Sequence, residues 1–127
     1  MKIRFQADAD LHPGIGRGLE ALEPAIDFRL AQGVIPDGTP DLGVLRFAAK
    51  AGRVLVTRDA RTMGKHFVAF TANDDSPGII LTPSRVGIGE AIRRLHNFWL
   101  NVTAEEMVKP NSLANEYPLA FTDGRSP

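Results

Sequence analysis

Residues 52–59 read GRVLVTRD, and this stretch is the strongest indication of the fold. Its centre, residues 54–56, is apolar and rich in β-branched side chains, which is typical of a central strand covered on both faces. Gly52 stands at the natural stop of a preceding helical pattern. Asp59 follows the strand, at the point where another helical pattern begins. The stretch therefore predicts a strand-to-helix unit of a parallel sheet.

The rest of the chain repeats this alternation of strands and helices. Strand-like segments are predicted at 3–7, 27–31, 53–58 and 78–82, and helix-like segments at 11–22, 40–51, 60–70 and 88–100. Such alternation predicts an α/β fold with a mostly parallel central sheet. Apolar and polar residues alternate in 27–31, which favours an edge position. A capping box at 103–106 predicts a short final helix, and 116–121 is predicted to form a last edge strand.

Two residues are expected to cap helices. Asp10 is placed to cap the helix predicted at 11–22. Thr39 is the expected N-cap of the next helix, with Pro40 at its first position.

Composition limits the class of protein. The 127 residues suit one domain, 1–127, with a core at about 2–100 and a C-terminal extension at 101–127. The formal net charge is zero, so nucleic-acid binding would need a local basic patch. The absence of cysteine excludes disulfides and thiolate metal sites. No signal-like start or membrane-length apolar run is visible, so a soluble, cytoplasmic protein without a membrane partner is expected.

Three aspartates are the candidate functional residues. Asp8 ends the first strand, Asp59 ends the strand at 53–58, and Asp41 opens the helix between them. In a parallel sheet, ligands bind outside the carboxyl ends of the strands. Carboxylates at that edge indicate a hard divalent cation and the phosphate chemistry that it supports.

Each of the three aspartates also has an ordinary structural interpretation. Asp8 could cap a helix, although Asp10 is better placed for that role. Asp59 could form an ion pair with Arg58 or Arg61 at the start of a helix. Asp41 could do no more than complement the dipole of the helix that it opens.

Other chemistries find less support. The glycines of 14–18 lack both the dinucleotide-binding and the Walker spacing. The three histidines show no metal-ligand spacing. Basic residues near the aspartates are either ordinary surface charge or a positive rim for a phosphate backbone: Arg17, Arg53, Arg58, Arg61 and Lys65.

Two segments together resemble a known family. ADADL at 7–11 is similar to the Ala-Asp-x-Asn-Leu opening of compact PIN-like domains. Residues 40–59, with an acid opening a helix that leads into GRVLVTRD, resemble their second signature, and 78–81 fits the strand that follows. The likeness covers roughly residues 2–100.

The resemblance implies a three-layer α/β/α sandwich with acidic residues gathered at the strand ends. PIN nucleases of this kind use such acids to bind Mg²⁺ or Mn²⁺ and to cut RNA, and many are toxins of toxin–antitoxin pairs. By position, Asp8, Asp41 and Asp59 match the catalytic and metal-binding acids. A protein antitoxin and a homodimer are expected from the resemblance alone.

Two departures from the family pattern qualify this expectation. Members often carry a further acid two residues after the last aspartate, where this chain has Arg61; Asp10 replaces the usual Asn. Asp10, Thr57, Arg58 and Arg61 are therefore expected as supporting or RNA-contacting residues. The alternatives are a metal-dependent endoribonuclease and a catalytically weak PIN-like scaffold that binds a protein or RNA.

Overall fold

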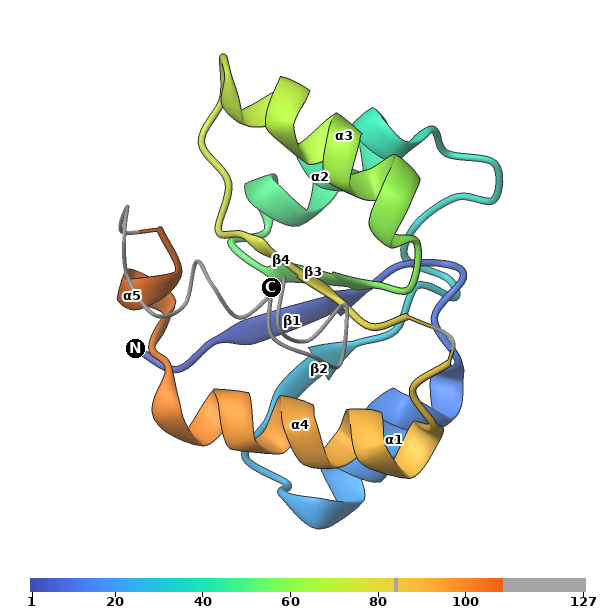
Figure 1. Ribbon diagram of the computed structural model, residues 1–127, viewed down its shortest axis with the longest axis vertical. Helices are drawn as coiled ribbons and strands as arrows, with labels where there is room; N and C mark the ends of the chain where they lie inside the picture. Colours follow the sequence, from blue (N-terminus) through green and yellow to red (C-terminus); the bar gives the residue numbers. More distant parts are fainter. Residues whose placement is uncertain (84, 109–127) are drawn as a thin grey trace.

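The computed structural model describes residues 1–83 and 85–108, and a parallel sheet lies at its centre (Figure 1). The strands are β1 (Arg4–Ala7), β2 (Asp27–Arg29), β3 (Val54–Thr57) and β4 (Ile79–Leu81). Their order is β2-β1-β3-β4, and every pair is parallel. All four residues of β3 are buried, which confirms the central strand predicted within 52–59. The edge position predicted for β2 is also confirmed.

Helices cover both faces of this sheet. The helices α1 (Pro13–Leu22) and α4 (Ile88–Asn101) pack together on one face, while α2 (Asp41–Lys50) and α3 (Ala60–Thr71) pack on the other (Figure 1). Each face has its own apolar cluster, one including Phe5 and Phe98 and the other Leu45 and Leu55. The α/β fold with three layers is therefore confirmed for the described residues.

The strand order creates a switch point between β1 and β3. From β1 the chain crosses to β2 by way of α1 on one face, whereas β3 connects to β4 by way of α3 on the other. Helices leave the carboxyl ends of β1 and β3 in opposite directions, so a crevice forms there, and this is where open α/β sheets bind ligands. The Asp8 amide donates to the Val56 carbonyl at 2.9 Å, so Asp8 lies beside the end of β3.

The N-caps predicted at Asp10 and Thr39 are both wrong. α1 begins at Pro13, and its N-cap is His12, whose Nδ1 accepts from the Gly14 amide at 2.9 Å. Asp10 lies outside the helix, because the turn after β1 takes two more residues than predicted. α2 begins at Asp41 after Pro40, whereas the Thr39 hydroxyl donates to the Pro36 carbonyl at 2.6 Å and does not cap the helix.

Glycines inside α1 serve packing. A Cβ at Gly16 would lie 2.7 Å from a ring carbon of Phe28, and one at Gly18 would overlap with Ile92 of α4. These two positions let α1 approach both the sheet and α4 closely. The Gly52 stop is confirmed by its φ of 67°, a conformation that favours glycine.

The chain after α4 is described only as far as residue 108. The capping box is confirmed: the Thr103 amide donates to Glu106 Oε1 at 3.0 Å, and α5 (Ala104–Val108) follows. The strand predicted at 116–121 lies outside the described residues. Among the helices that the structure does describe, none has the length and apolar character needed to span a membrane.

Candidate functional site

Asp8 is the centre of the candidate site. It follows β1 directly, and the pairing of β1 with both neighbours leaves it only 8% exposed. Its Oδ1 accepts from the Ala9 amide at 2.8 Å, and its Oδ2 accepts from the Thr57 hydroxyl at 2.8 Å. Burial raises the pKa of Asp8 above its ordinary value, although both hydrogen bonds oppose this effect. The protein therefore keeps a carboxyl group where its charge is costly.

Thr57 orients Asp8 from the neighbouring strand. Its side chain is fully buried at the end of β3. The hydroxyl donates to Asp8, and the same oxygen accepts from the Asp59 amide at 3.2 Å. With its hydrogen committed to Asp8, this hydroxyl holds the carboxylate in one orientation. Thr57 is thus in contact with the aspartate that it was predicted to support.

Asp10 and Asp41 add negative charge around Asp8. Both carboxylates lie close enough to raise the pKa of Asp8 further, after the larger effect of burial. Asp10 is exposed in the β1–α1 turn, and Asp41 opens α2 across the crevice. Accumulated carboxylate charge around a buried acid is the arrangement that a bound cation stabilises.

Asp59 has a different environment. Its Oδ1 accepts from the Thr62 amide at 3.0 Å, which makes Asp59 the N-cap of α3. It is not among the charged groups that shift the pKa of Asp8. Within the described residues, Asp59 forms no ion pair with Arg58, and the Arg61 side chain is outside them. The cap accounts for Asp59 structurally, and its predicted metal role stays a prediction.

The fit of this site to a divalent cation is partial. Among the residues that the structure describes, no group of three or more His, Asp or Glu side chains is placed to hold a metal ion. Asp8 nevertheless suits a ligand role, because each of its oxygens accepts one hydrogen bond and a carboxylate offers about four lone-pair positions. Asp10 and Asp41, whose charges act on Asp8, are the further carboxylates that could serve as metal ligands. The cluster of Asp8, Asp41 and Asp59 around one cation stays a prediction.

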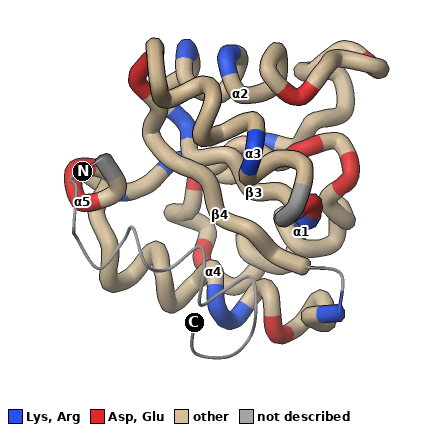
Figure 2. Tube along the Cα trace, turned by 45° about the horizontal axis from the view of Figure 1, so that its top comes forward, with Lys and Arg blue, Asp and Glu red and all other residues tan. Residues whose placement is uncertain are grey.

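The basic residues do not form one rim around these acids. Arg53 forms an ion pair with Asp27 at 2.7 Å, at the opposite, amino-terminal end of the strands. Figure 2 shows basic and acidic positions interspersed along the trace. The interpretation of this set as ordinary surface charge therefore suits Arg53. Arg58 differs, because it is exposed directly after Thr57.

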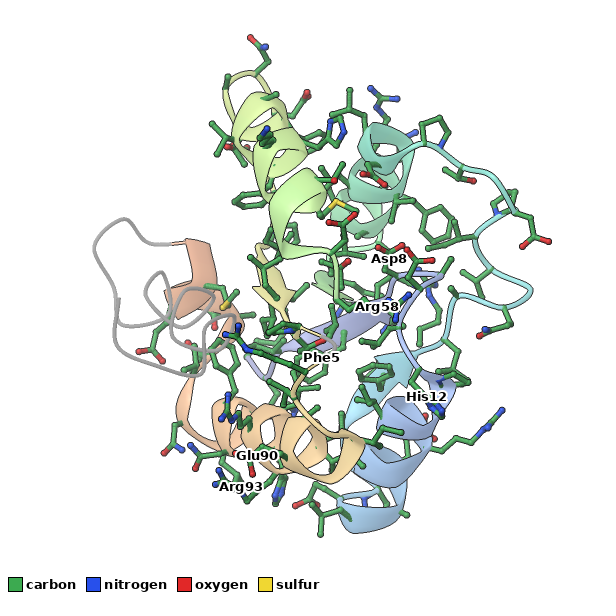
Figure 3. The ribbon with its side chains drawn as sticks, turned by 45° about the vertical axis from the view of Figure 1, so that its right-hand side comes forward. Phe5, Asp8, His12, Arg58, Glu90 and Arg93 are labelled. Carbon is green, nitrogen blue, oxygen red and sulfur yellow. The ribbon has the colours of Figure 1, made fainter. Side chains whose placement is uncertain are left out.

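A cavity of about 550 Å³ adjoins the acidic residues. Its walls come from the β1–α1 turn, the end of β3, the loop after β4 and the first turn of α4. Asp10, His12 and Arg58 contribute its polar groups, together with the buried Thr82. Figure 3 shows the labelled Arg58 between Asp8 and His12. Asp10 thus belongs both to the surroundings of Asp8 and to the cavity.

Two histidines near the site were not expected there. His66 Nε2 lies 3.7 Å from Asp41 Oδ2, and His12 lines the cavity. His66 follows Asp59 by seven residues, two helical turns, so this spacing would have placed both on one face of α3. No comparable spacing signals His12.

Comparison of the chain with family models, with curated proteins and with solved structures finds no match. The resemblance to PIN-like domains therefore stays a prediction.

Proposed function

We propose that this protein is a metal-dependent endoribonuclease of the PIN-like type. The observation that carries the proposal is Asp8, a buried carboxylate held by Thr57 at the switch point of the sheet, with Asp10 and Asp41 adding negative charge. If the fold required only a polar side chain at position 8, a neutral residue would make the folded state more stable than the buried carboxylate does. The position and chemistry of Asp8 favour a cation ligand at a phosphate-processing site.

In this proposal, each residue of the site has a separate role in metal binding or RNA contact. Asp8 would hold Mg²⁺ or Mn²⁺ directly, with Asp41 and Asp59 as direct or water-mediated ligands. The cation, when bound, supplies charge neutralisation at the scissile phosphate and lowers the pKa of an attacking water. Thr57 keeps Asp8 in one orientation, and the exposed Arg58 is free to contact the RNA backbone.

The experiment is cleavage of single-stranded RNA with Mn²⁺ or Mg²⁺. Wild type should cleave the RNA, and Asp8→Asn should cleave it about 100-fold more slowly or worse, because removal of one charge-stabilising group at a reacting centre commonly lowers the rate by that factor. Asp75→Asn is the matched control, since Asp75 is an exposed loop aspartate away from the crevice. Undiminished cleavage by Asp8→Asn would exclude this site.

A second candidate is a PIN-like scaffold that binds RNA or a protein without cutting. The specific observation in its favour is that Asp59 serves as the N-cap of α3. It also agrees with a second observation: among the described residues, no three His, Asp or Glu side chains are placed together to hold a metal ion. This candidate predicts RNA binding that is the same in EDTA and in Mn²⁺, with no cleavage products.

The proposal extends to partners and location. A protein antitoxin and self-association as a homodimer rest on the family resemblance, and the cysteine-free composition is compatible with a cytoplasmic location. Size-exclusion chromatography with light scattering would test the dimer, because a mass of 13.8 kDa would indicate a monomer. Expression of the chain alone would test the toxin role: growth arrest by wild type but not by Asp8→Asn is expected.

A further inference from the structure

The cavity beside Asp8 combines apolar walls with a charged mouth. Ile15 and Ala91 are buried in its wall, Val86 is partly buried, and Ile88 is an apolar side chain left 41% exposed. Its volume of about 550 Å³ is within the roughly 300–1,000 Å³ typical of small-molecule sites. The exposed Ile88 is accounted for if a ligand covers it.

The polar groups of the mouth differ in sign and in hydrogen-bonding type. Arg58 is exposed, and within residues 1–83 and 85–108 it has no hydrogen bond or ion pair. His12 uses Nδ1 to accept from Gly14, so the neutral ring carries its hydrogen on Nε2 and donates from there. Asp10 offers only acceptors. One cation, one neutral donor and one acceptor therefore surround an apolar space.

This combination suits a nucleotide. A base is flat and apolar on its faces and carries donors and acceptors at its edge, whereas its phosphate is an anion. Apolar side chains can contact the faces, Asp10 and His12 can bond the edge, and Arg58 can bind the phosphate. A purely apolar ligand would leave Arg58 and Asp10 without a function.

We propose that the cavity binds the nucleotide next to the phosphodiester that is cut. The base would lie against Ile15, Val86 and Ile88, with its phosphate at Arg58. Because Asp10 lines the cavity and its charge also acts on Asp8, a nucleotide here would place the adjoining phosphate near the acidic site. This inference rests on the proposed function. It assigns to the cavity the contact with the base beside the cleaved bond, so the cavity would determine which base is preferred there.

The test is a titration of the full chain in EDTA, followed by the methyl NMR signals of the isoleucines and valines. The probes are 5′-AMP, 5′-GMP, 5′-CMP and 5′-UMP, with inorganic phosphate as the anion alone, each up to about 10 mM to detect weak binding. Saturable shifts of the Ile15, Val86 and Ile88 methyl signals are expected with at least one nucleotide. Unequal affinities among the four would identify the preferred base.

Two exposed positions supply variants that should fold. Arg58→Gln removes the cation, and Ile88→Trp fills the mouth; each should weaken nucleotide binding about tenfold or more. Arg46→Gln on α2 and Leu100→Trp at the far end of α4 are matched controls, since both residues are exposed away from the cavity. The controls should bind as wild type does.

Three results would overturn the inference: no shifts with any nucleotide, binding that survives both variants, or inorganic phosphate that binds as tightly as the nucleotides. Omission of metal separates this test from the nuclease test. Nucleotide binding without RNA cleavage would leave the cavity assignment standing and reject the proposed function. Cleavage without nucleotide binding would do the reverse.

Discussion

Thr57 donates its hydroxyl hydrogen to Asp8 at 2.8 Å, across the boundary between β3 and β1. The bond joins residues 49 positions apart in the chain, and it is buried. It fixes one carboxylate oxygen at the switch point of the sheet, and the other is fixed by the Ala9 amide. The rigid core of the protein thus sets the orientation of this carboxylate.

Replacement of Thr57 tests this bond. Thr57→Val removes the hydroxyl at nearly constant volume and leaves a buried carboxylate oxygen without its donor, so a loss of about 1–3 kcal/mol in the free energy of unfolding is expected. Thr57→Ser keeps the hydroxyl and loses only a methyl group, for about 1 kcal/mol. Urea denaturation measures both. Equal stability of the two variants would mean that the hydrogen bond contributes little.

Asp8 should make stability depend on pH. Because burial raises the pKa of Asp8 above 3.8, the folded protein binds more protons than the unfolded chain between that value and the raised pKa. The contribution of Asp8 to stability is therefore most favourable below pH 3.8, falls as pH rises through the raised pKa, and is constant above it. Asp8→Asn removes this pH-dependent loss of stability. The Nδ2 of the new asparagine can donate to the Thr57 hydroxyl, which reorients to accept.

The measurement is urea denaturation of wild type and Asp8→Asn in EDTA from pH 3.5 to neutral. The stability of the variant relative to wild type should increase with pH. A difference that stays constant across this range would show that Asp8 titrates with an ordinary pKa in the folded protein, and one that decreases with pH would show that its pKa is lowered; either result would contradict the raised pKa.

Two substitutions with different chemistry can distinguish a helix-capping role of Asp59 from a metal-binding role. Asp59→Asn keeps a good N-cap, whereas Asp59→Ala removes it and should cost about 1 kcal/mol. If Asp59 also binds metal, as proposed, both variants should lose cleavage, although only the alanine variant loses stability. Full activity of Asp59→Asn would restrict Asp59 to its role as a helix cap.

The glycines of α1 predict a contrast in stability. Gly16→Ala would bring its Cβ within 2.7 Å of Phe28, so a loss of about 1–3 kcal/mol is expected. Gly64→Ala in α3 meets no heavy atom within 4 Å and should gain about 0.5–1 kcal/mol by helix propensity. Thermal denaturation compares the two. A stabilised Gly16→Ala variant would contradict the close packing of α1 against the sheet.

Local patterns were sufficient to predict the fold. The apolar run within 52–59 predicted β3, and its position at the sheet centre follows from side chains buried on both faces. The alternation of 27–31 predicted an edge strand, and β2 is one. Helix starts were less predictable, because Asp10 and Thr39 have side chains that suit a cap but lie in turns whose lengths depend on tertiary packing.

The candidate site could be predicted only in part. Asp8 could be identified because it directly follows a predicted strand, and ligands bind at the edge of a parallel sheet where the carboxyl ends of its strands lie. Its bond to Thr57 and the proximity of Asp10 and Asp41 depend on strand pairing and helix docking, which the sequence pattern does not specify. The cavity was not predictable, since its walls join the β1–α1 turn to the loop before α4, more than seventy residues later.

Metal binding tests the central claim most directly. Titration of wild type with Mn²⁺ by calorimetry should show saturable binding at millimolar or lower metal, with protons released if Asp8 is partly protonated beforehand. Asp8→Asn should abolish this binding, while Asp75→Asn should preserve it. No binding by wild type at millimolar Mn²⁺, or equal binding by Asp8→Asn, would contradict the assignment of Asp8 as a cation ligand.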